Sequence, residues 1–320
     1  DDRVIETTEG VRCWRKSVPI EKVGLYVPGG SAPLFSTVLM LGIPAKIAGC
    51  GHIILCTPAN KEGKVNPVIL YTADLIGIKN IFKVGGAQAI AAMAYGTETI
   101  SKVYKIFGPG NQYVTAAKQL VSQDGIAIDM LAGPSEVAVI ADKSSNPEFV
   151  ASDLLAQAEH GKDSQVFLFT CDESIIEPVL FQIEKQLNLL QRKDLAKASL
   201  SNSKIIVLKN YDEIMEMVNE YAPEHLILSS QNADNLIDKV INAGSVFIGN
   251  YTPESAGDYA SGTNHTLPTG GQAKISGGVS VDSFVKKITF QKILENGLLK
   301  LGPHIEKMAE VEQLDAHKNS

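Results

Sequence analysis

Two short segments carry the side chains best suited to chemistry. Gln157 and His160 are three residues apart, so a helix would place both on one face, where they could supply two ligands to a metal ion. The plainer interpretation is a helix end, where His160 complements the helix dipole and Gly161 forms the cap. Glu224 and His225 are adjacent, and burial could tune such a pair for general acid–base catalysis, although an isolated Glu-His is usually surface.

Two more distant residues could extend this set. Asp258 offers hard oxygen ligands but is also typical of a turn, and His317 lies in a segment where a tail would usually fray. Carboxylate, carboxamide and imidazole together make a nitrogen and oxygen ligand set without thiolate. Because spacing cannot bring such distant positions together, the residues alone support no more than a metal-assisted α/β enzyme.

Three glycine-rich loops follow apolar β-type runs and precede helical patterns. They are Val27–Gly30, Gly85–Gln88 and Gly108–Asn111. In a parallel sheet these loops lie at the carboxyl edge, where backbone N–H groups at helix N-termini suit phosphate. Each loop alone is equally well explained as a tight turn, and no GxGxxG or GxxxxGK[ST] motif occurs. The set favours a nucleotide site without identifying it.

The elements that must position these residues alternate between short apolar runs and longer helical patterns, which predicts βαβ units. The predicted strands are Val23–Val27, His52–Cys56, Asn80–Val84, Val103–Phe107, Glu136–Ala141, Gln165–Thr170, Lys204–Leu208, His225–Leu228 and Ser245–Gly249. The predicted helices are Ser36–Ala48, Pro67–Gly77, Gln88–Tyr95, Asn111–Ser122, Pro147–Glu159, Glu173–Leu190, Tyr211–Tyr221 and Ala233–Ala243. We therefore expect an α/β protein with two doubly wound parallel-sheet domains, joined near Leu131–Ser135.

The remaining sequence has a different character. Asn250–Gly278 is rich in Gly, Ser, Thr and Pro and predicts a long functional loop. Val279–Ser320 is predicted to be helical, with Phe284 and Ile288 among its apolar contacts.

The composition is that of a globular protein. The 320 residues are 44% hydrophobic and 20% charged, and this length predicts about two domains. A net charge of −7 argues against a nucleic-acid partner. Four scattered cysteines form neither a disulfide framework nor a CxxC pair, so we expect a reducing, cytoplasmic location. The most apolar stretch, Val38–Cys56, is interrupted by polar residues, which predicts no membrane span.

Eight motifs occur in order along the chain. They are Val27–Gly30, Val84–Gln88, Phe107–Asn111, Leu131–Ser135, Gln157–His160, Ala222–His225, Pro253–His265 and Asp315–His317. This series closely resembles the histidinol dehydrogenase family from about residue 2 to residue 319. The Pro253–His265 block is particularly specific, because an irregular loop has no packing pattern that would recreate it by accident.

The resemblance implies an NAD-dependent, zinc-requiring oxidation of L-histidinol to L-histidine through L-histidinaldehyde, the last two steps of histidine biosynthesis. By matching positions it implies one zinc ion, which orients the substrate, and an acid–base pair made of Glu224 and His225. The implied zinc ligands are Gln157, His160, Asp258 and His317. The implied substrate contacts are Ser135, Gln157, His160, His225, Asp258, His265, Glu312 and His317. The implied NAD contacts are Tyr26, Gln88 and Asn111.

The resemblance also implies a homodimer with shared active sites, in which Glu312 and His317 reach the partner subunit. It predicts two incomplete Rossmann-like domains and a small helical C-terminal extension, with the N-terminal part of the family fold absent. The predicted segments are a lead-in of a truncated domain (1–22), an NAD-contacting α/β domain (23–134), a second α/β domain with the zinc and catalytic motifs (135–278) and a helical dimerisation segment (279–320). Two alternatives remain open here: a zinc-dependent hydrolase using Glu224, and a non-enzymatic zinc- or nucleotide-binding module.

Overall fold

The computed structural model of this chain describes residues 3–29, 33–130 and 133–320. Gly30, Leu131 and Ala132, which belong to predicted motifs, lie outside the described residues. Contacts divide the chain into a terminal unit, Asp1–Ile20 with Phe284–Ser320, and a main unit, Glu21–Ser283. No helix in the described part of the chain has the length and hydropathy needed to cross a bilayer.

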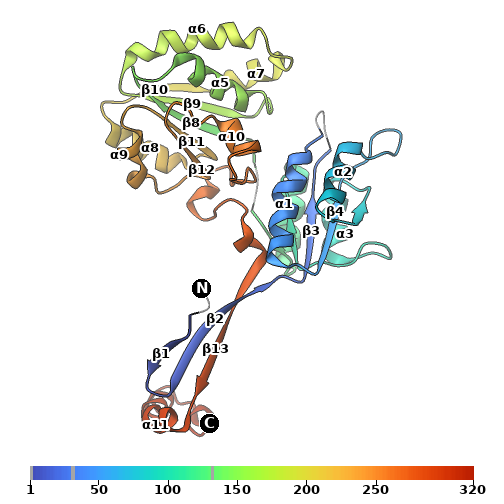
Figure 1. Ribbon diagram of the computed structural model, residues 1–320, viewed down its shortest axis with the longest axis vertical. Helices are drawn as coiled ribbons and strands as arrows, with labels where there is room; N and C mark the ends of the chain where they lie inside the picture. Colours follow the sequence, from blue (N-terminus) through green and yellow to red (C-terminus); the bar gives the residue numbers. More distant parts are fainter. Residues whose placement is uncertain (1–2, 30–32, 131–132) are drawn as a thin grey trace. The chain divides into compact units, whose positions relative to one another are not determined.

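The first sheet of the main unit has five parallel strands in the order β5-β4-β3-β6-β7 (Figure 1). Its strands alternate with helices along the chain, as the sequence pattern predicts. The elements are β3 (Lys22–Tyr26), α1 (Phe35–Ala48), β4 (His52–Cys56), α2 (Pro67–Leu75), β5 (Asn80–Phe82), α3 (Gly86–Tyr95), β6 (Lys105–Phe107), α4 (Gln112–Gln123) and β7 (Ala127–Ile128).

The second sheet also has five parallel strands, in the order β10-β9-β8-β11-β12. The elements up to its third strand are β8 (Glu136–Ala141), α5 (Pro147–Ala158), β9 (Gln165–Thr170), η1 (Glu173–Ile175), α6 (Ile176–Leu187), α7 (Lys193–Leu200) and β10 (Lys204–Val207). The rest of the main unit adds α8 (Tyr211–Tyr221), β11 (His225–Ser229), α9 (Ala233–Leu236), η2 (Ile237–Lys239), β12 (Ser245–Ile248), α10 (Glu254–Tyr259) and η3 (Gln272–Lys274), and η4 (Val281–Phe284) ends it.

The central strand β8 shows why this sheet has helices on both faces. Alternate residues of a strand point to opposite faces. Val137 and Val139 pack in one apolar cluster with residues of α5 and α6, and Ala138 and Ile140 pack in another with residues of α8. All six residues of β8 are buried, which explains its uninterrupted apolar run.

The two sheets share one topology. If strands are numbered within each sheet in chain order, both read third, second, first, fourth, fifth. The chain reverses its direction of winding between β3 and β6 in the first sheet and between β8 and β11 in the second. This is a doubly wound Rossmann-like order, so the predicted fold class is confirmed.

The structure corrects several local predictions. The predicted helix Ala233–Ala243 is only the short α9 followed by η2, and it ends at Lys239. The predicted loop Asn250–Gly278 contains α10, which begins after Pro253 at the N-cap position. The short elements α7 and β7 were not predicted. The predicted helical character of Val279–Ser320 holds only from Glu295, because Val285–Ile293 forms a strand, β13.

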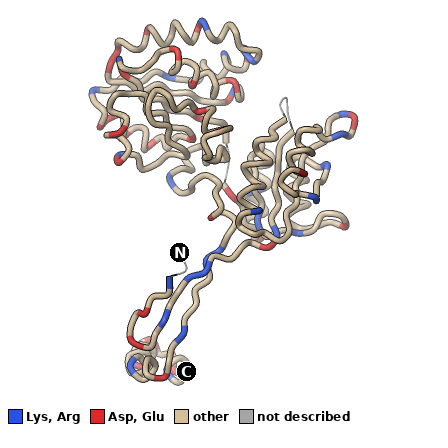
Figure 2. The backbone as a smooth tube through the Cα atoms, viewed as in Figure 1, with Lys and Arg blue, Asp and Glu red and all other residues tan. Residues whose placement is uncertain are grey.

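The terminal unit joins the two ends of the chain. Its strands β1 (Ile5–Thr8), β2 (Val11–Pro19) and β13 (Val285–Ile293) form an antiparallel sheet, followed by α11 (Glu295–Val311) and α12 (Asp315–Lys318). The β13 segment contains the β-branched residues Val285, Ile288, Thr289 and Ile293 and the aromatic Phe290, which are residue types that favour a strand. Figure 2 shows Lys and Arg spaced along β2 and β13. Trp14 stacks on Phe290 across the pair, with ring centroids 5.5 Å apart.

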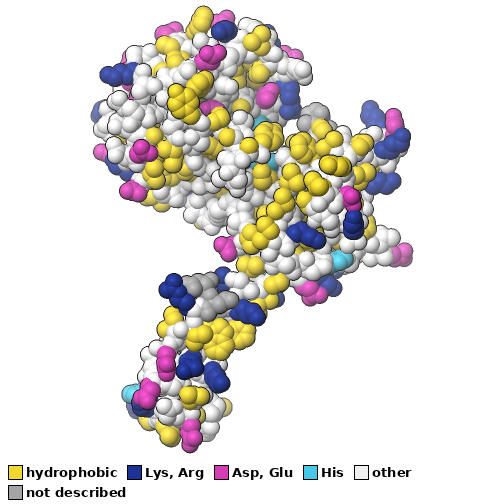
Figure 3. All heavy atoms as spheres, in the orientation of Figure 1, with side chains coloured by type: hydrophobic (Ala, Val, Ile, Leu, Met, Phe, Trp, Pro, Cys, Tyr) yellow, Lys and Arg dark blue, Asp and Glu magenta, His cyan; other side chains and the backbone are white. Residues whose placement is uncertain are grey.

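Apolar side chains stay exposed on this unit (Figure 3). On α11 they include Leu299, Met308 and Val311, which are 72%, 68% and 72% exposed. The predicted division into segments 1–22, 23–134, 135–278 and 279–320 stays a prediction.

Substitution of Gly108 should destabilise the first sheet more than substitution of Gly125. Both glycines have positive φ, but a Cβ on Gly108 would lie 2.0 Å from the Tyr26 carbonyl oxygen, whereas a Cβ on Gly125 meets nothing within 4 Å. In urea unfolding we expect Gly125→Ala to lose about 1 kcal/mol from backbone strain alone and Gly108→Ala to lose about 3 kcal/mol or more. Equal losses in the free energy of unfolding would contradict this prediction, because they would mean that the Tyr26 backbone shifts to accommodate the Cβ at no cost.

Candidate active site

The predicted acid–base pair lies where a helix ends and a buried strand begins. After α8, Ala222 turns the chain in the left-handed conformation with φ 55°, and β11 begins at His225. Glu224 and His225 are 7% and 4% exposed. His225 is paired with Val137 of β8 in the parallel ladder. Glu224 and His225 therefore lie at the amino end of β11, beside the amino end of β8.

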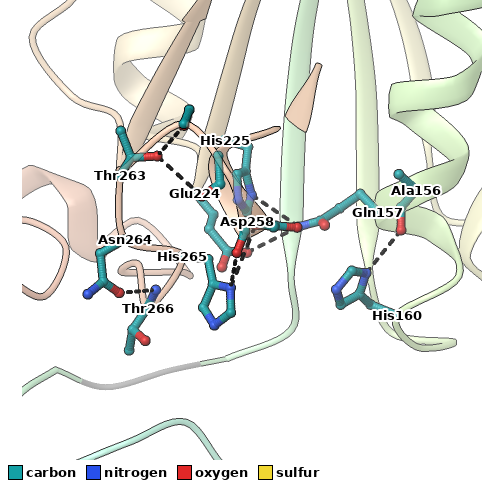
Figure 4. A network of polar contacts seen from close by, with 12 residues as sticks. Ala156, Gln157, His160, Glu224, His225, Asp258, Thr263, Asn264, His265 and Thr266 are labelled. Carbon is teal, nitrogen blue, oxygen red and sulfur yellow. Dashed lines mark hydrogen bonds and ion pairs between the residues drawn. The ribbon is translucent and has the colours of Figure 1, made fainter. Parts of the chain in front are cut away.

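The Glu224 carboxyl is held by two neutral donors, of which Figure 4 shows the Gln157 amide. Its Oε2 accepts from the backbone N–H of Glu136 at 3.0 Å and from Nε2 of Gln157 at 3.2 Å. These donors lie on β8 and α5, and Glu224 itself immediately precedes β11, so its carboxyl links these three elements.

The His225 ring has one occupied and one open nitrogen. Nδ1 lies 3.4 Å from the Glu136 carbonyl oxygen and 3.4 Å from Gln157 Nε2, and the first contact requires a proton on Nδ1. The Gln157 amide already donates to Glu224 at a shorter distance, which favours the tautomer that donates to Glu136. Nε2 is buried and has no hydrogen-bond partner among the described residues. This tautomer leaves Nε2 with a lone pair able to accept a proton.

Burial controls the electrostatics of the pair. It raises the pKa of Glu224 well above its ordinary value, and the charges of Glu136 and Asp258 add to this rise. Burial also lowers the pKa of His225 to about 4, with smaller contributions from the charges of His160 and His265. The imidazole is therefore neutral at pH 7 and the neighbouring carboxyl is a stronger base than an exposed one.

Three of the residues predicted to hold a metal, Gln157, His160 and Asp258, line the same cleft of the main unit. Gln157, on α5, is 1% exposed, and its Oε1 has no partner among the described residues. His160 follows the end of α5, and its Nδ1 lies 3.0 Å from the Ala156 carbonyl oxygen. A ligating histidine typically donates from its other nitrogen to such a carbonyl. Asp258, on α10, lies with Oδ1 4.0 Å from His265 Nδ1.

This donor set fits a divalent cation. The pKa values of Glu224, Glu254 and Asp258 are all raised, first by burial and, for the two glutamates, also by neighbouring carboxylates. A dication would relieve that repulsion. Within the described residues no three His, Cys, Asp or Glu side chains form a metal-binding group on their own. The Gln157 carboxamide, whose Oε1 has no partner among the described residues, offers a further oxygen donor beside His160 and Asp258.

Two predicted site residues belong to the terminal unit. Glu312 is the C-cap residue of α11, and His317 lies in α12. The other predicted site residues lie together in the main unit. They are Gln157, His160, Glu224, His225, Asp258 and His265.

Two cavities border these residues in the main unit. The smaller one is lined by Gly108, Ser135, Glu224 and His265, among others. A larger open cleft is lined by most of the predicted catalytic, metal and substrate residues. Those residues are Ser135, Gln157, His160, Glu224, His225, Asp258 and His265.

Of the three predicted NAD contacts, only Asn111 lines the cleft. Its Oδ1 caps α4 by accepting from the N–H groups of Tyr113 and Val114, each at 3.1 Å. Tyr26 is buried, and its hydroxyl accepts from the Gly86 N–H at 3.0 Å. Gln88 is an exposed residue of α3 and lines neither cavity.

Three acidic residues of the site were not predicted. Glu136 supplies a donor to Glu224 and an acceptor to His225 through its backbone. Glu254, which is 1% exposed, precedes Asp258 by one turn of α10, and its N–H donates to Asp153 of α5 at 3.3 Å. Asp153 in turn precedes Gln157 by one turn. This spacing was visible in the sequence, but only the fold shows that the carboxyls are buried.

The chain matches a known family over its whole length. A model of the histidinol dehydrogenase family matches residues 1–320. The chain belongs to the histidinol dehydrogenase family. The dehydrogenase of histidine biosynthesis predicted from the eight motifs is thus confirmed, in preference to the hydrolase and the regulatory module.

Relatives of the histidinol dehydrogenase family agree with this assignment. The histidinol dehydrogenase of Bacteroides fragilis strain YCH46 is 63% identical over 320 residues, which are 100% of this chain and 75% of that protein. That of Campylobacter jejuni strain RM1221 is 55% identical over 318 residues, covering 99% of this chain and 73% of that protein.

Solved structures show the same fold. The crystal structure of histidinol dehydrogenase from Elizabethkingia anophelis, 63% identical, superposes with a TM-score of 0.98 and covers 100% of this chain and 74% of that one. An acetylating aldehyde dehydrogenase from Geobacillus thermoglucosidasius shares the fold alone, with a TM-score of 0.58 at 14% identity over 91% of this chain and 79% of that one.

Asp153 should make the stability of the main unit depend on pH. Burial raises its pKa from 3.8 to about 6, so the folded protein binds its proton more tightly than the unfolded chain does. The free energy of unfolding should then fall as pH rises through this range. Asp153→Asn keeps an acceptor for Glu254 and removes the ionisation, so we expect it to be up to about 3 kcal/mol more stable than the parent near pH 8 and similar near pH 4.

Urea unfolding at both pH values checks this prediction. Asp238→Asn, at an exposed position, is the matched control and should differ little from the parent at either pH. A variant Asp153→Asn that is no more stable near pH 8 would contradict the proposed burial cost.

Proposed function

We propose that this chain oxidises L-histidinol to L-histidine through L-histidinaldehyde, with NAD as the hydride acceptor and zinc as a required ion. The observation that carries this proposal is the buried His225 imidazole, whose Nε2 has no partner among the described residues, beside the buried carboxyl of Glu224. Such a pair offers a base for an alcohol and a base for water within one cavity. Membership in the histidinol dehydrogenase family supports the choice of substrate.

His225 would take the proton of the substrate hydroxyl as hydride leaves the carbon. A pKa of about 4 keeps the ring neutral at physiological pH, so Nε2 is ready to accept. The Nδ1 contact with the Glu136 carbonyl would hold the ring in this tautomer and stabilise the charge that develops.

Glu224 would serve the second oxidation. The aldehyde must be hydrated before another hydride can leave, and a carboxyl with a raised pKa is suited to take a proton from water. Hydride loss from the hydrate gives the carboxylate directly, so no covalent enzyme intermediate is needed. No cysteine is among the described residues that line the two cavities, and burial raises the pKa of Cys56 to about 12.

Zinc would be held by Gln157, His160 and Asp258 of one subunit together with a His317 that reaches over from its partner. The support is the buried Oε1 of Gln157, which has no partner among the described residues, and the contact of His160 Nδ1 with a backbone carbonyl, which leaves Nε2 as the nitrogen for a metal. When bound, zinc would hold the imidazole and amino nitrogens of the substrate. Ser135, His265 and Glu312 would complete the substrate contacts, and Tyr26, Gln88 and Asn111 would contact NAD.

The active sites would be shared in a homodimer. The exposed apolar side chains of α11, among them Leu299, Met308 and Val311, support a subunit contact by the terminal unit. Glu312 and His317 would then act in the partner's site. A cytoplasmic location is supported by the four cysteines, which lie within the described residues and are thiols rather than disulfides.

Histidinol should reduce NAD in the presence of this protein, with two NADH formed per histidine. Chelation of zinc should abolish the reaction, and added zinc should restore it. Glu224→Gln should still form one NADH and accumulate histidinaldehyde, with the second step slowed about 100-fold or more. His225→Gln should slow both steps. Absorbance of NADH and chromatography of the products measure these outcomes.

The matched control is Glu216→Gln, which makes the same change at an exposed position of α8 and should retain parent activity. A hydrolase activity that needs no NAD would refute the proposed dehydrogenase function. Formation of histidine by Glu224→Gln at the parent rate would refute the proposed role of Glu224.

A mixing experiment tests the shared site. Glu224→Gln and His317→Asn should each be inactive in the full reaction. Mixed, unfolded and refolded together, they should recover part of the activity, because a mixed dimer contains one site with both residues intact. No recovery from dimers proven to be mixed would place His317 in its own subunit's site.

A further inference from the structure

A buried ion pair holds the glycine loop at the end of the first sheet. The side chains of Lys118, on α4, and Asp129, which follows β7, are 2% and 1% exposed. Lys118 Nζ donates to Asp129 Oδ1 and, at 3.1 Å, to the carbonyl oxygen of Gly108. Asp129 Oδ2 accepts from the N–H of the same glycine at 2.7 Å. The pair therefore satisfies both backbone polar atoms of Gly108.

Stability alone does not explain this arrangement. A buried ion pair gains little over apolar side chains of similar volume, because both charges must be desolvated. Here both charged groups also bind Gly108, which follows the last residue of β6 and has a φ of 125° that favours glycine. Asp129 is held beside the end of β6, because its backbone N–H donates to the carbonyl oxygen of Ile106 at 3.1 Å. The ion pair therefore fixes the backbone conformation of the loop that begins at Gly108.

That loop borders both cavities. Gly108 and Asp129 line the smaller cavity, together with Glu224 and His265. Gly110 and Asn111, which continue the loop into α4, line the larger cleft. A shift of Gly108 would move the wall of the cleft and the N-terminus of α4 together. The loop also lies at the crevice between β3 and β6, where the winding of the sheet reverses and dinucleotides generally bind.

We propose that the Lys118–Asp129 pair is a positioning device for the dinucleotide, holding the Gly108–Asn111 loop in the conformation that receives NAD. This inference rests on the proposed use of NAD. The two side chains are buried and together carry no net charge, so they would act through the Gly108 backbone and not by attracting phosphate. Both are positioning residues, and the expected signature is a loss of NAD affinity without a matching loss of histidinol affinity.

A neutral double variant separates positioning from stability. In Lys118→Met/Asp129→Leu no buried charge is left alone, so the protein should stay folded and unfold at a higher urea concentration than either single variant, although the Gly108 N–H and C=O lose their partners. We expect its Kd for NAD, measured by calorimetry, and its KM for NAD to rise about tenfold or more, while the KM for histidinol stays within about twofold. The matched control is Lys239→Met/Asp212→Leu, which removes an exposed ion pair of 2.5 Å and should bind NAD like the parent.

The single variants distinguish positioning from charge. Lys118→Met leaves a negative charge at the loop, and Asp129→Leu leaves a positive one. If the pair acted through its electrostatic field, Asp129→Leu, which leaves a positive charge at the loop, would bind the NAD phosphates more tightly than the parent does. Positioning predicts that both single variants weaken NAD binding, because each releases one backbone atom of Gly108.

The parent protein supplies a measurement that does not depend on any variant folding. NAD should slow amide hydrogen exchange in peptides that cover 108–118 and 126–130. Unchanged exchange there, or a folded neutral double variant with parent affinity for NAD, would overturn the inference. If the parent itself binds no NAD, the proposed function fails instead, and the two failures are thereby distinguished.

Discussion

The buried carboxyl of Glu224 constrains the rest of the active site. Its two hydrogen-bond donors, the Glu136 N–H and the Gln157 amide, are neutral, so they offset its desolvation only in part. The remaining cost appears as a raised pKa, which is useful for a base near neutral pH. The position of both donors follows from the parallel register of β8 and β11 and from the packing of α5. The chemistry thus depends on how well these three elements hold their mutual register.

The two sheets share a topology but use opposite edges. In the first, the glycine loops lie at the carboxyl edge, where doubly wound sheets generally bind ligands. In the second, the acid–base pair lies at the amino ends of β8 and β11. The carboxyl edge of these strands is filled from within: Asp142 accepts from the Tyr211 hydroxyl at 2.6 Å, and Ser145 donates to the Ser229 carbonyl. The usual crevice of the second sheet is thus occupied by the protein's own side chains.

Much of this architecture could be predicted from local patterns, and its failures have physical causes. The buried run Glu136–Ala141 and the amphipathic helix Tyr211–Tyr221 match their predicted bounds, because a single apolar pattern covers each. The sequence predicts a helix where β13 forms, because the partner strand β2 lies at the other end of the sequence and leaves no local signal. The glutamates and the Lys118–Asp129 pair were missed for a related reason: charged residues read as surface until the tertiary structure buries them.

The pairing of β2 with β13 has a consequence for biosynthesis. Pro19 is opposite Val285 and Val11 is opposite Ile293, so the register joins two segments that are far apart in the sequence and are therefore synthesised at different times. The sheets of the main unit have all their strands between these two segments and can assemble on the ribosome while β2 has only β1 beside it. Closure of so distant a pair is entropically slow, and during that interval an exposed strand edge is open to other chains. Lys16, Lys286 and Lys287 on these strands would help keep such edges apart until the ladder closes.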